Sequence, residues 1–289
     1  MPTDEVLCVG ELLWDALPAG LFLGGAPFNV ACHLSAAGVS VAMVSRVGAD
    51  RLGEEAVRRA QRYGVVTDLV QVDPTLPTGF VSATIDDSGE ANYVIVDGVA
   101  WDAIEPNDVL LARAEKSRAI VFGSLAQRHA TTRRTIERLW ASKALMVFDL
   151  NLRPPFEDPE VIRRSLQRAD VVKVTTEELQ LLASWFGLPR GDRESASALS
   201  RLFSCPVICV TRGPAGAALW RDDSWTEHPG FEVEVRDTVG AGDAFLAVLL
   251  AGLLSGADSE TLLKSANLMG AHVATQFGAL PADQFAASP

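Results

Sequence analysis

A carboxylate that follows a glycine-rich run is the feature of this sequence that most directly suggests chemistry. Residues 237–243 have the sequence Asp-Thr-Val-Gly-Ala-Gly-Asp, and a long apolar stretch follows at once. If this stretch is a helix, the backbone N–H groups of Gly240, Ala241 and Gly242 lie at its start, where their partial positive charges can hold an anion. Asp243, in the same turn, can accept a proton. This combination favours transfer of a phosphoryl group to a hydroxyl group.

The same local pattern is also typical of purely structural roles. An aspartate before an apolar helix is often an N-cap, and Gly-Ala-Gly is often a tight turn. Two other nucleotide sites are excluded, because Phe245 replaces the third glycine of a dinucleotide-binding fingerprint and no Gly-Lys-Ser or Gly-Lys-Thr of a Walker loop occurs.

Residues 231–236 alternate apolar and charged side chains, which predicts a half-buried strand that leads into the turn.

A second glycine-containing motif lies near the N-terminus, after a predicted buried strand. Gly24 and Gly25 are followed by Pro27, a residue type favoured at helix starts. The glycine pair lets the backbone approach a ligand closely, because glycine has no side chain. Asp15 and Asn29 lie on either side of the pair. We predict that their side chains face the hydroxyl groups of a sugar.

The two motifs, in this order, resemble the two signatures of the ribokinase-like PfkB sugar kinases, and the resemblance extends over nearly the whole chain. Within that family, Glu-Leu-Leu-Trp-Asp at residues 11–15 and Gly-Gly-Ala-Pro-Phe-Asn at residues 24–29 are most similar to fructokinases. The resemblance implies ATP-dependent phosphorylation of a sugar hydroxyl, with D-fructose converted to fructose 6-phosphate. It also implies ATP and Mg²⁺ as cofactors and leaves a monovalent cation such as K⁺ open.

The resemblance also implies roles for individual residues. Asp243 is the proton acceptor, and the N–H groups of residues 240–243 hold the charge of the transferring phosphoryl group. Because a helix start lowers the pKa of a carboxylate, we expect Asp243 to be a weak base that suffices for a late proton transfer. Arg153 bridges the acceptor and the phosphate. The acceptor is held by Asp15, Gly24, Gly25, Asn29 and Asn151, and the nucleotide by Lys173, Thr211, Gly213, Gly216 and Asn267.

One position departs from the family pattern. The family has an Asn-x-x-Glu motif that helps to organise magnesium, and the corresponding segment here begins with Thr175 instead of asparagine. Glu178 keeps the position of the glutamate. We therefore expect Glu178 to act on the metal through a water molecule, while the contribution of Thr175 stays open.

The rest of the sequence predicts the scaffold. Strand-like apolar runs alternate with helical patterns, which indicates an α/β fold with a mostly parallel central sheet flanked by helices, and the resemblance implies the ribokinase-like fold. Ligands of such sheets bind at the C-terminal ends of the strands. With 289 residues, the chain is expected to form a single domain, residues 1–289. The strand-like runs are residues 39–44, 119–122, 144–148, 171–174 and 207–210.

Two segments, approximately residues 12–24 and 77–101, break the alternation. Residues 79–96 contain two strand-like runs around a polar turn, which predicts a β-hairpin, and a turn near residues 18–20 predicts another. Neither hairpin can cover its apolar side chains alone, so we expect a small β-sheet that forms a lid over the sugar site. The resemblance implies the same lid and a homodimer formed through its edges.

Composition limits the partners. The formal net charge is −12 and the sequence pI is about 4.8, which argues against a nucleic-acid partner or an anionic membrane surface, because phosphate groups require basic patches. The opening residues, Met-Pro-Thr-Asp-Glu, lack the basic start and apolar core of a signal peptide. We therefore expect a cytoplasmic protein whose partners are a small-molecule sugar and ATP.

Three alternative functions compete with this one. The acceptor can instead be ribose, 2-keto-3-deoxygluconate or a nucleoside, because pocket residues rather than the phosphoryl-transfer groups set that choice. A catalytically weak sugar-binding regulator on the same fold is favoured slightly by Thr175 and disfavoured by the intact Gly-Ala-Gly-Asp run. A nicotinamide-dependent dehydrogenase has little support, since its fingerprint is missing.

Overall fold

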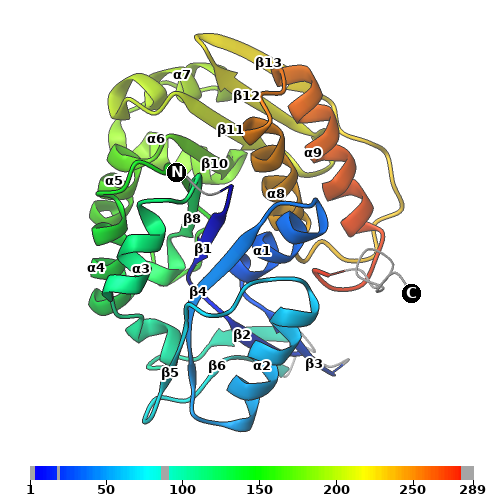
Figure 1. Ribbon diagram of the computed structural model, residues 1–289. Coiled ribbons are helices and arrows are strands. Elements are labelled where there is room, and N and C mark those ends of the chain that lie inside the picture. Colours follow the sequence, from blue (N-terminus) through cyan, green and yellow to red (C-terminus); the bar gives the residue numbers. More distant parts are fainter. Residues whose placement is uncertain (1–3, 18–19, 86–90, 281–289) are drawn as a thin grey trace.

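Two β-sheets form the framework of the protein (Figure 1). The computed structural model describes residues 4–17, 20–85 and 91–280. Over these residues the larger sheet has nine strands and the smaller sheet has four. The spatial order of the larger sheet is β13 (Ser224–His228), β12 (Ala217–Arg221), β11 (Val207–Thr211), β10 (Val171–Thr175), β9 (Leu145–Asp149), β8 (Ala119–Gly123), β1 (Val6–Val9), β4 (Val41–Gly48) and β5 (Val70–Asp73).

The larger sheet is mostly parallel, as the sequence predicts. From β11 to β5 the neighbouring strands run parallel, and β12 and β13 add antiparallel pairs at one edge. The register places Asp149 opposite both Gly123 and Lys173, and Thr175 opposite Thr211. The C-terminal ends of these strands therefore meet at one edge, where ligands of parallel sheets bind.

Helices cover both faces of this sheet, because side chains alternate along each strand. In β1, Val6 and Cys8 belong to one apolar core, whereas Leu7 and Val9 belong to the other. The first core is completed by α1 (Ala26–Ala36), α2 (Arg51–Arg62), α8 (Ala241–Leu254) and α9 (Ser259–Ala274), and the second by α3 (Asp108–Ala114), α4 (Ala130–Leu139), α5 (Pro159–Arg168), α6 (Thr176–Phe186) and α7 (Asp192–Phe203).

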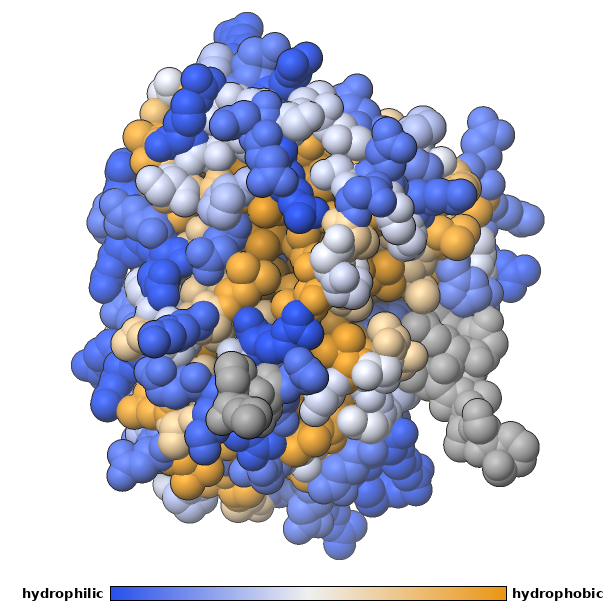
Figure 2. Space-filling model, turned by 45° about the horizontal axis from the view of Figure 1, so that its top comes forward, coloured by the Kyte–Doolittle hydropathy of each residue, from blue (hydrophilic) through white to orange (hydrophobic). Residues whose placement is uncertain are grey.

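Helix α8 is apolar on nearly all sides, and it is accordingly enclosed between α1, α9 and the sheet. Its burial fixes the position of its first turn, which carries Asp243. Within the described part of the chain, no helix is long and apolar enough to cross a membrane. On the face that is turned forward in Figure 2, apolar side chains gather near the centre and polar side chains border them.

The smaller sheet forms the predicted lid structure. Its strands are arranged in the order β3-β2-β6-β7, with antiparallel pairing inside each hairpin and a parallel pair between β2 and β6. Leu13, Val81, Val99 and the fully buried Trp101 form a small apolar core on one side. Much of the predicted turn near residues 18–20, and residues 86–90, lie outside the described residues. The strands are β2 (Leu13–Leu17), β3 (Gly20–Gly24), β6 (Gly79–Ile85) and β7 (Ala91–Ile95).

The strand predicted at residues 231–236 is wrong. This segment has no regular secondary structure, and Val233 and Val235 are exposed. Strand β13, which precedes this segment, already forms that edge of the large sheet. Gly230 follows β13 with a φ of 84° and turns the chain away from the sheet. The segment is instead attached to the end of α9 by a hydrogen bond from the Arg236 N–H to the carbonyl of Ala274. Alternation alone cannot make a strand where no partner strand is available.

We expect Gly216→Ala to destabilise the protein much more than Gly38→Ala. Both glycines have a φ near +80°, which costs an alanine about 1 kcal/mol. A Cβ on Gly216 would lie 2.0 Å from the backbone oxygen of His228, whereas a Cβ on Gly38 would meet no described atom within 4 Å. Overpacking should add about 1–3 kcal/mol at Gly216 alone. Chemical denaturation of both variants measures this difference, and equal losses of stability would contradict the steric argument.

Candidate active site

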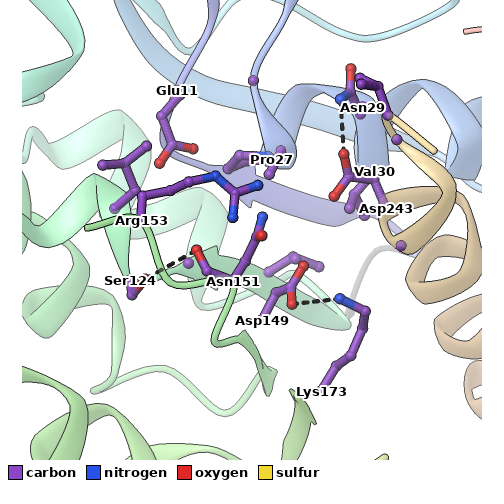
Figure 3. Close-up of a pocket in the computed structure, with 18 of the residues that line it drawn as sticks. Glu11, Pro27, Asn29, Val30, Ser124, Asp149, Asn151, Arg153, Lys173 and Asp243 are labelled. Carbon is purple, nitrogen blue, oxygen red and sulfur yellow. Dashed lines mark hydrogen bonds and ion pairs between the residues drawn. The ribbon is translucent and has the colours of Figure 1, made fainter. Parts of the chain in front are cut away.

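A cleft of about 470 Å³ lies between the C-terminal edge of the large sheet and the small sheet. The ends of β8, β9, β10 and β11 form its floor, and Leu13, Val81 and Ile95 of the small sheet form an apolar wall. Figure 3 shows polar side chains from several elements converging there. Among the predicted site residues, those that line the cleft are Asp15, Gly25, Asn29, Asn151, Arg153, Lys173, Thr211, Gly240, Gly242 and Asp243, whereas Gly24, Glu178, Gly213, Gly216, Ala241 and Asn267 do not.

The two glycine-containing motifs meet at a hydrogen bond. Asn29 in α1 donates its side-chain N–H to Asp243 in α8, with 2.8 Å between Nδ2 and Oδ2 (Figure 3). The amide N–H of Asn29 thus holds the carboxylate of Asp243, and a contact between Asn29 and the sugar stays a prediction. Its Oδ1 atom is buried and has no hydrogen-bond partner among the described residues. Asn29 therefore orients Asp243 and still has one acceptor available for a ligand.

The Asp243 carboxyl is buried, and burial raises its pKa to about 7. The negative charge of Asp149 raises the pKa further, while the hydrogen bond from Asn29 and the charges of Lys173 and Arg153 lower it. The expectation of a lowered pKa at the helix start is therefore wrong, because desolvation of the charged form outweighs the helix dipole. A carboxylate with this pKa is well matched to proton transfer near neutral pH.

The start of α8 is the turn at which the sequence predicts an anion site. Gly240 is the N-cap residue, with a φ of 76°, and a Cβ there would lie 2.3 Å from Cβ of Ala279. The N–H of Ala241 already donates to the carbonyl of Thr238 at 3.2 Å. Gly242 and Asp243 follow in the first turn, where N–H groups have no acceptor inside the helix. These two N–H groups are the ones best placed to hold an anion.

A buried ion pair lies beside this turn. Lys173 at the end of β10 donates to Asp149 at the end of β9, with 2.8 Å between Nζ and Oδ1 (Figure 3). Burial alone would lower the pKa of Lys173, but the adjacent charge of Asp149 raises it, so the lysine stays charged. The Lys173 ammonium also packs against Gly242. It therefore brings a positive charge to the anion site.

Asp149 is a site residue that the sequence analysis missed. Its Oδ2 atom is buried without a hydrogen-bond partner among the described residues, and the residue lines the cleft. The signal was available in the sequence, since an aspartate that ends a buried strand lies at the ligand-binding edge of a parallel sheet.

A short loop after β9 carries Asn151 and Arg153 into the cleft. Asn151 has a φ of 39°, a left-handed conformation that asparagine tolerates better than most residues. Ser124 approaches its carbonyl, with 3.5 Å between Oγ and O. The guanidinium of Arg153 points toward the middle of the cleft, between Glu11 and Asn151 (Figure 3). The loop thus places one amide and one cation above the strand ends.

Glu178 supports this loop from outside the cleft. Its Oε1 accepts the N–H of Leu152 at 2.7 Å, and its Oε2 accepts the N–H of Thr175 at 2.8 Å. Thr175, which replaces the family asparagine, is the N-cap of α6 and its hydroxyl accepts the Glu178 N–H. The two residues form a capping box. The replacement by threonine therefore keeps the helix start intact.

The other end of the cleft contains the predicted acceptor residues. Asp15 lines it, and burial raises the pKa of Asp15 to about 6. Gly24 does not line the cleft but lies against this carboxylate, because an added Cβ would be 2.2 Å from Oδ2 of Asp15. A Cβ on Gly25 would be 2.3 Å from the backbone oxygen of Glu11. Both glycines are therefore required for close packing, and Glu11 is a second lining residue that the sequence analysis missed.

The predicted nucleotide residues are only partly brought together. Thr211 lines the cleft at the end of β11. Gly213 and Gly216 lie farther along, in the turn before β12. Asn267 is buried in α9, where its side-chain N–H donates to the carbonyl of Leu263 at 2.7 Å. For these three residues a contact with the nucleotide stays a prediction.

We expect Asp243→Asn to stabilise the unliganded protein more near pH 8 than near pH 5. The pKa of Asp243 is about 7 in the folded protein against an ordinary value of 3.8. The contribution of Asp243 to the free energy of unfolding is complete below pH 3.8, where its carboxyl is protonated in both states. This contribution is lost as the pH rises from there through about 7. Asparagine does not ionise, so the variant loses none of it. Thermal denaturation at both pH values measures this effect.

The matched control is Asp258→Asn, at the exposed N-cap of α9, where asparagine caps as well as aspartate. Hydrogen bonds from Thr261 lower the pKa of Asp258, so this variant should show no gain near pH 8. A gain for Asp243→Asn that is equal at both pH values would contradict the burial argument.

Comparisons with known proteins agree with this geometry. The family model described as pfkB family carbohydrate kinase matches residues 18–284. A fructokinase of Rhizobium leguminosarum bv. trifolii is 31% identical over 267 residues, which cover 86% of this chain and 79% of that protein. The matched residues include β3, β6 and β7 of the small sheet and the start of α8.

Solved structures are similar over nearly the whole chain. An uncharacterized sugar kinase of Pyrococcus horikoshii in complex with ATP has a TM-score of 0.82 at 29% identity and covers 95% of this chain and 93% of its own. The fructokinase of Vibrio cholerae O395 in its fructose, ADP and calcium ion bound form has a TM-score of 0.81 at 26% identity, with 98% of each chain covered. A double mutant of that enzyme is known in a fructose, ADP and potassium ion bound form. The match of the family model over most of the chain shows that this protein belongs to the PfkB family of carbohydrate kinases.

Proposed function

We propose that this sugar kinase transfers the γ-phosphoryl group of ATP to the 6-hydroxyl of D-fructose, with Asp243 as the proton acceptor. The observation that carries the proposal is the position of Asp243, whose buried carboxylate lies in one cleft with the first turn of α8 and with Asp15 near the small sheet. The similarity to a Rhizobium fructokinase and to a fructose-bound Vibrio structure supports fructose as the acceptor.

In the proposed reaction, Asp243 accepts the proton of the sugar hydroxyl. The hydroxyl oxygen forms a bond to the γ-phosphorus, and the bond between that phosphorus and the β,γ-bridging oxygen breaks to release ADP. The transition state of such a transfer is loose, so positioning and charge stabilisation contribute more than strong basicity. The raised pKa of Asp243 nevertheless helps, since a pKa of about 7 allows the base form to exist at neutral pH and to hold a proton once it is transferred.

The charge of the transferring group would be held by the N–H groups of Gly242 and Asp243 together with Lys173. The ammonium of Lys173 packs against Gly242, so these donors face the same place. Arg153, whose guanidinium points into the cleft, would bridge the acceptor and the phosphate. Donors that are fixed before the reaction stabilise developing charge without a reorganisation cost.

Mg²⁺ fits the oxygen donors near the phosphate site. Magnesium keeps several water ligands and is held mainly through the phosphates and one or two carboxylates. Asp149 has an unpaired Oδ2 in the cleft. Each carboxylate oxygen of Glu178 accepts one backbone N–H, which leaves lone pairs for a water molecule. When bound, the ion would neutralise charge on the phosphates. The potassium ion in the Vibrio structure supports a monovalent cation as well.

We also propose a homodimer that forms through the edges of the small sheet, in a cytoplasmic protein. Leu21, Phe22 and Val94 are large apolar side chains on β3 and β7 that are about half exposed. These strands are the two edges of the sheet, where backbone groups are available for pairing. Sedimentation equilibrium tests the proposal, and a monomer at micromolar concentration would contradict it.

Substrate profiling tests the proposed acceptor. D-fructose, D-ribose and 2-keto-3-deoxygluconate are supplied with ATP and Mg²⁺, and ADP formation is measured by a coupled assay. We expect the highest kcat/KM with D-fructose. A higher value with one of the other acceptors would overturn fructose, and ATP turnover with none of them would overturn the proposed sugar phosphorylation.

We expect Asp243→Asn to lower kcat by about 10²–10⁴-fold, the range typical of a positioned proton acceptor. Asparagine has nearly the same shape as aspartate, carries no charge and can still accept the hydrogen bond from Asn29. The variant should therefore keep the fold. Asp258→Asn serves again as the control and should keep full activity. Sugar phosphorylation by Asp243→Asn at the rate of the unmodified enzyme would exclude Asp243 from the role.

A further inference from the structure

Glu11 is a buried carboxylate that faces the cleft and lacks a hydrogen-bond partner on one oxygen. Its exposed fraction is 2%, it lines the cleft, and its Oε2 accepts no hydrogen bond from the described residues. Figure 3 shows the carboxyl group pointing toward the space in front of Arg153. A buried acceptor of this kind is rare in native structures and needs a physical explanation.

Hydrogen bonds fix the backbone before Glu11 and thereby set the direction of the Glu11 side chain. Gly10 donates its N–H to the carbonyl of Val44 at 3.0 Å and accepts the hydroxyl of Ser45 at 2.7 Å. On the other side of Glu11, Leu12 is fully buried in the apolar core. The bend at the end of β1 therefore holds the side chain of Glu11 in the cleft.

Among the described residues, no donor reaches Oε2 of Glu11. Arg128 uses two nitrogens to bind Asp102, at 2.7 and 2.8 Å. Arg153 lies nearer to the cleft and donates instead to the carbonyl of Leu152 at 2.9 Å. Burial raises the pKa of Glu11 to about 7, and the positive charges of the two arginines oppose this shift through space. The missing hydrogen bond must therefore come from a ligand or from water in the cleft.

The surroundings define the chemistry of that ligand. Asp15 is a second carboxylate at the same end of the cleft. Leu13, Val81 and Ile95 form an apolar wall there. A neutral sugar offers hydroxyl donors along its edges and C–H groups on its faces, which match both kinds of surface. A sugar acid would bring a third negative charge close to two carboxylates that are already poorly solvated.

We propose that Glu11 is a specificity-determining residue that accepts hydrogen bonds from hydroxyl groups of a neutral sugar and, with Asp15, disfavours sugar acids. This inference rests on the proposed function and narrows the class of its acceptor. The contact between Gly25 and the backbone of Glu11 links this residue to the first glycine motif. The acceptor site is thus built from the end of β1, the small sheet and the start of α1.

The test is Glu11→Gln, which keeps the size of the side chain and replaces one acceptor oxygen by a donor. We expect KM for D-fructose to rise about 10- to 100-fold, as for the loss of a hydrogen bond to a charged group, with KM for ATP unchanged. The ratio of kcat/KM for D-fructose over 2-keto-3-deoxygluconate should fall about 10-fold or more. Glu177→Gln, at an exposed position of α6, is the matched control and should change none of these values.

The outcomes separate this inference from the proposed function. An unchanged KM for D-fructose in Glu11→Gln overturns the inference, and so does an equal loss for sugar, sugar acid and ATP, which indicates a structural role. A preference of the unmodified enzyme for the sugar acid overturns the inference while the kinase activity stands. If no acceptor is phosphorylated, the proposed function falls, and calorimetric titration of D-fructose into both proteins still decides whether Glu11 binds the sugar.

Discussion

The hydrogen bond from Asn29 to Asp243 is the interaction on which the site depends. It joins a helix start near the N-terminus to a helix start near the C-terminus, across 214 residues of sequence. The bond can form because α8 is apolar and must be buried against α1, α9 and the sheet. The starts of α1 and α8 therefore meet in one cleft only when the whole chain is folded.

A second constraint is the burial of charge at the edge of the large sheet. Asp149, Asp243 and Glu11 are all buried, with Lys173 as the one lysine in direct contact with this group among the described residues. Such a cluster reduces stability, because charged groups lose their hydration and only some of them gain a partner. Buried carboxyl groups with a raised pKa that share a cleft, as Asp243 and Glu11 do here, are typical of functional sites. The apolar packing of both faces of the sheet supplies the stability that tolerates them.

The sequence predicted the scaffold well because its signals are local. Apolar runs such as residues 119–122 and 207–210 became β8 and β11, and the glycine pair precedes α1 as expected. The prediction failed where contacts with distant parts of the chain decide the structure of a segment. Residues 231–236 alternate like a strand but have no free sheet edge to join among the described residues. A contact between Asn267 and the nucleotide stays a prediction, and the side-chain N–H of Asn267 donates within α9.

By itself the sequence determined the order of elements, the two glycine motifs and the carboxylate at the start of α8, because periodicity and glycine content act within a few residues. Tertiary structure alone decided which groups meet. It turned Asn29 toward Asp243, paired Lys173 with Asp149 and left Oε2 of Glu11 without a hydrogen-bond partner among the described residues. It also reversed the expected pKa shift of Asp243, since desolvation depends on how many atoms surround a carboxylate and not on the residues beside it in the chain.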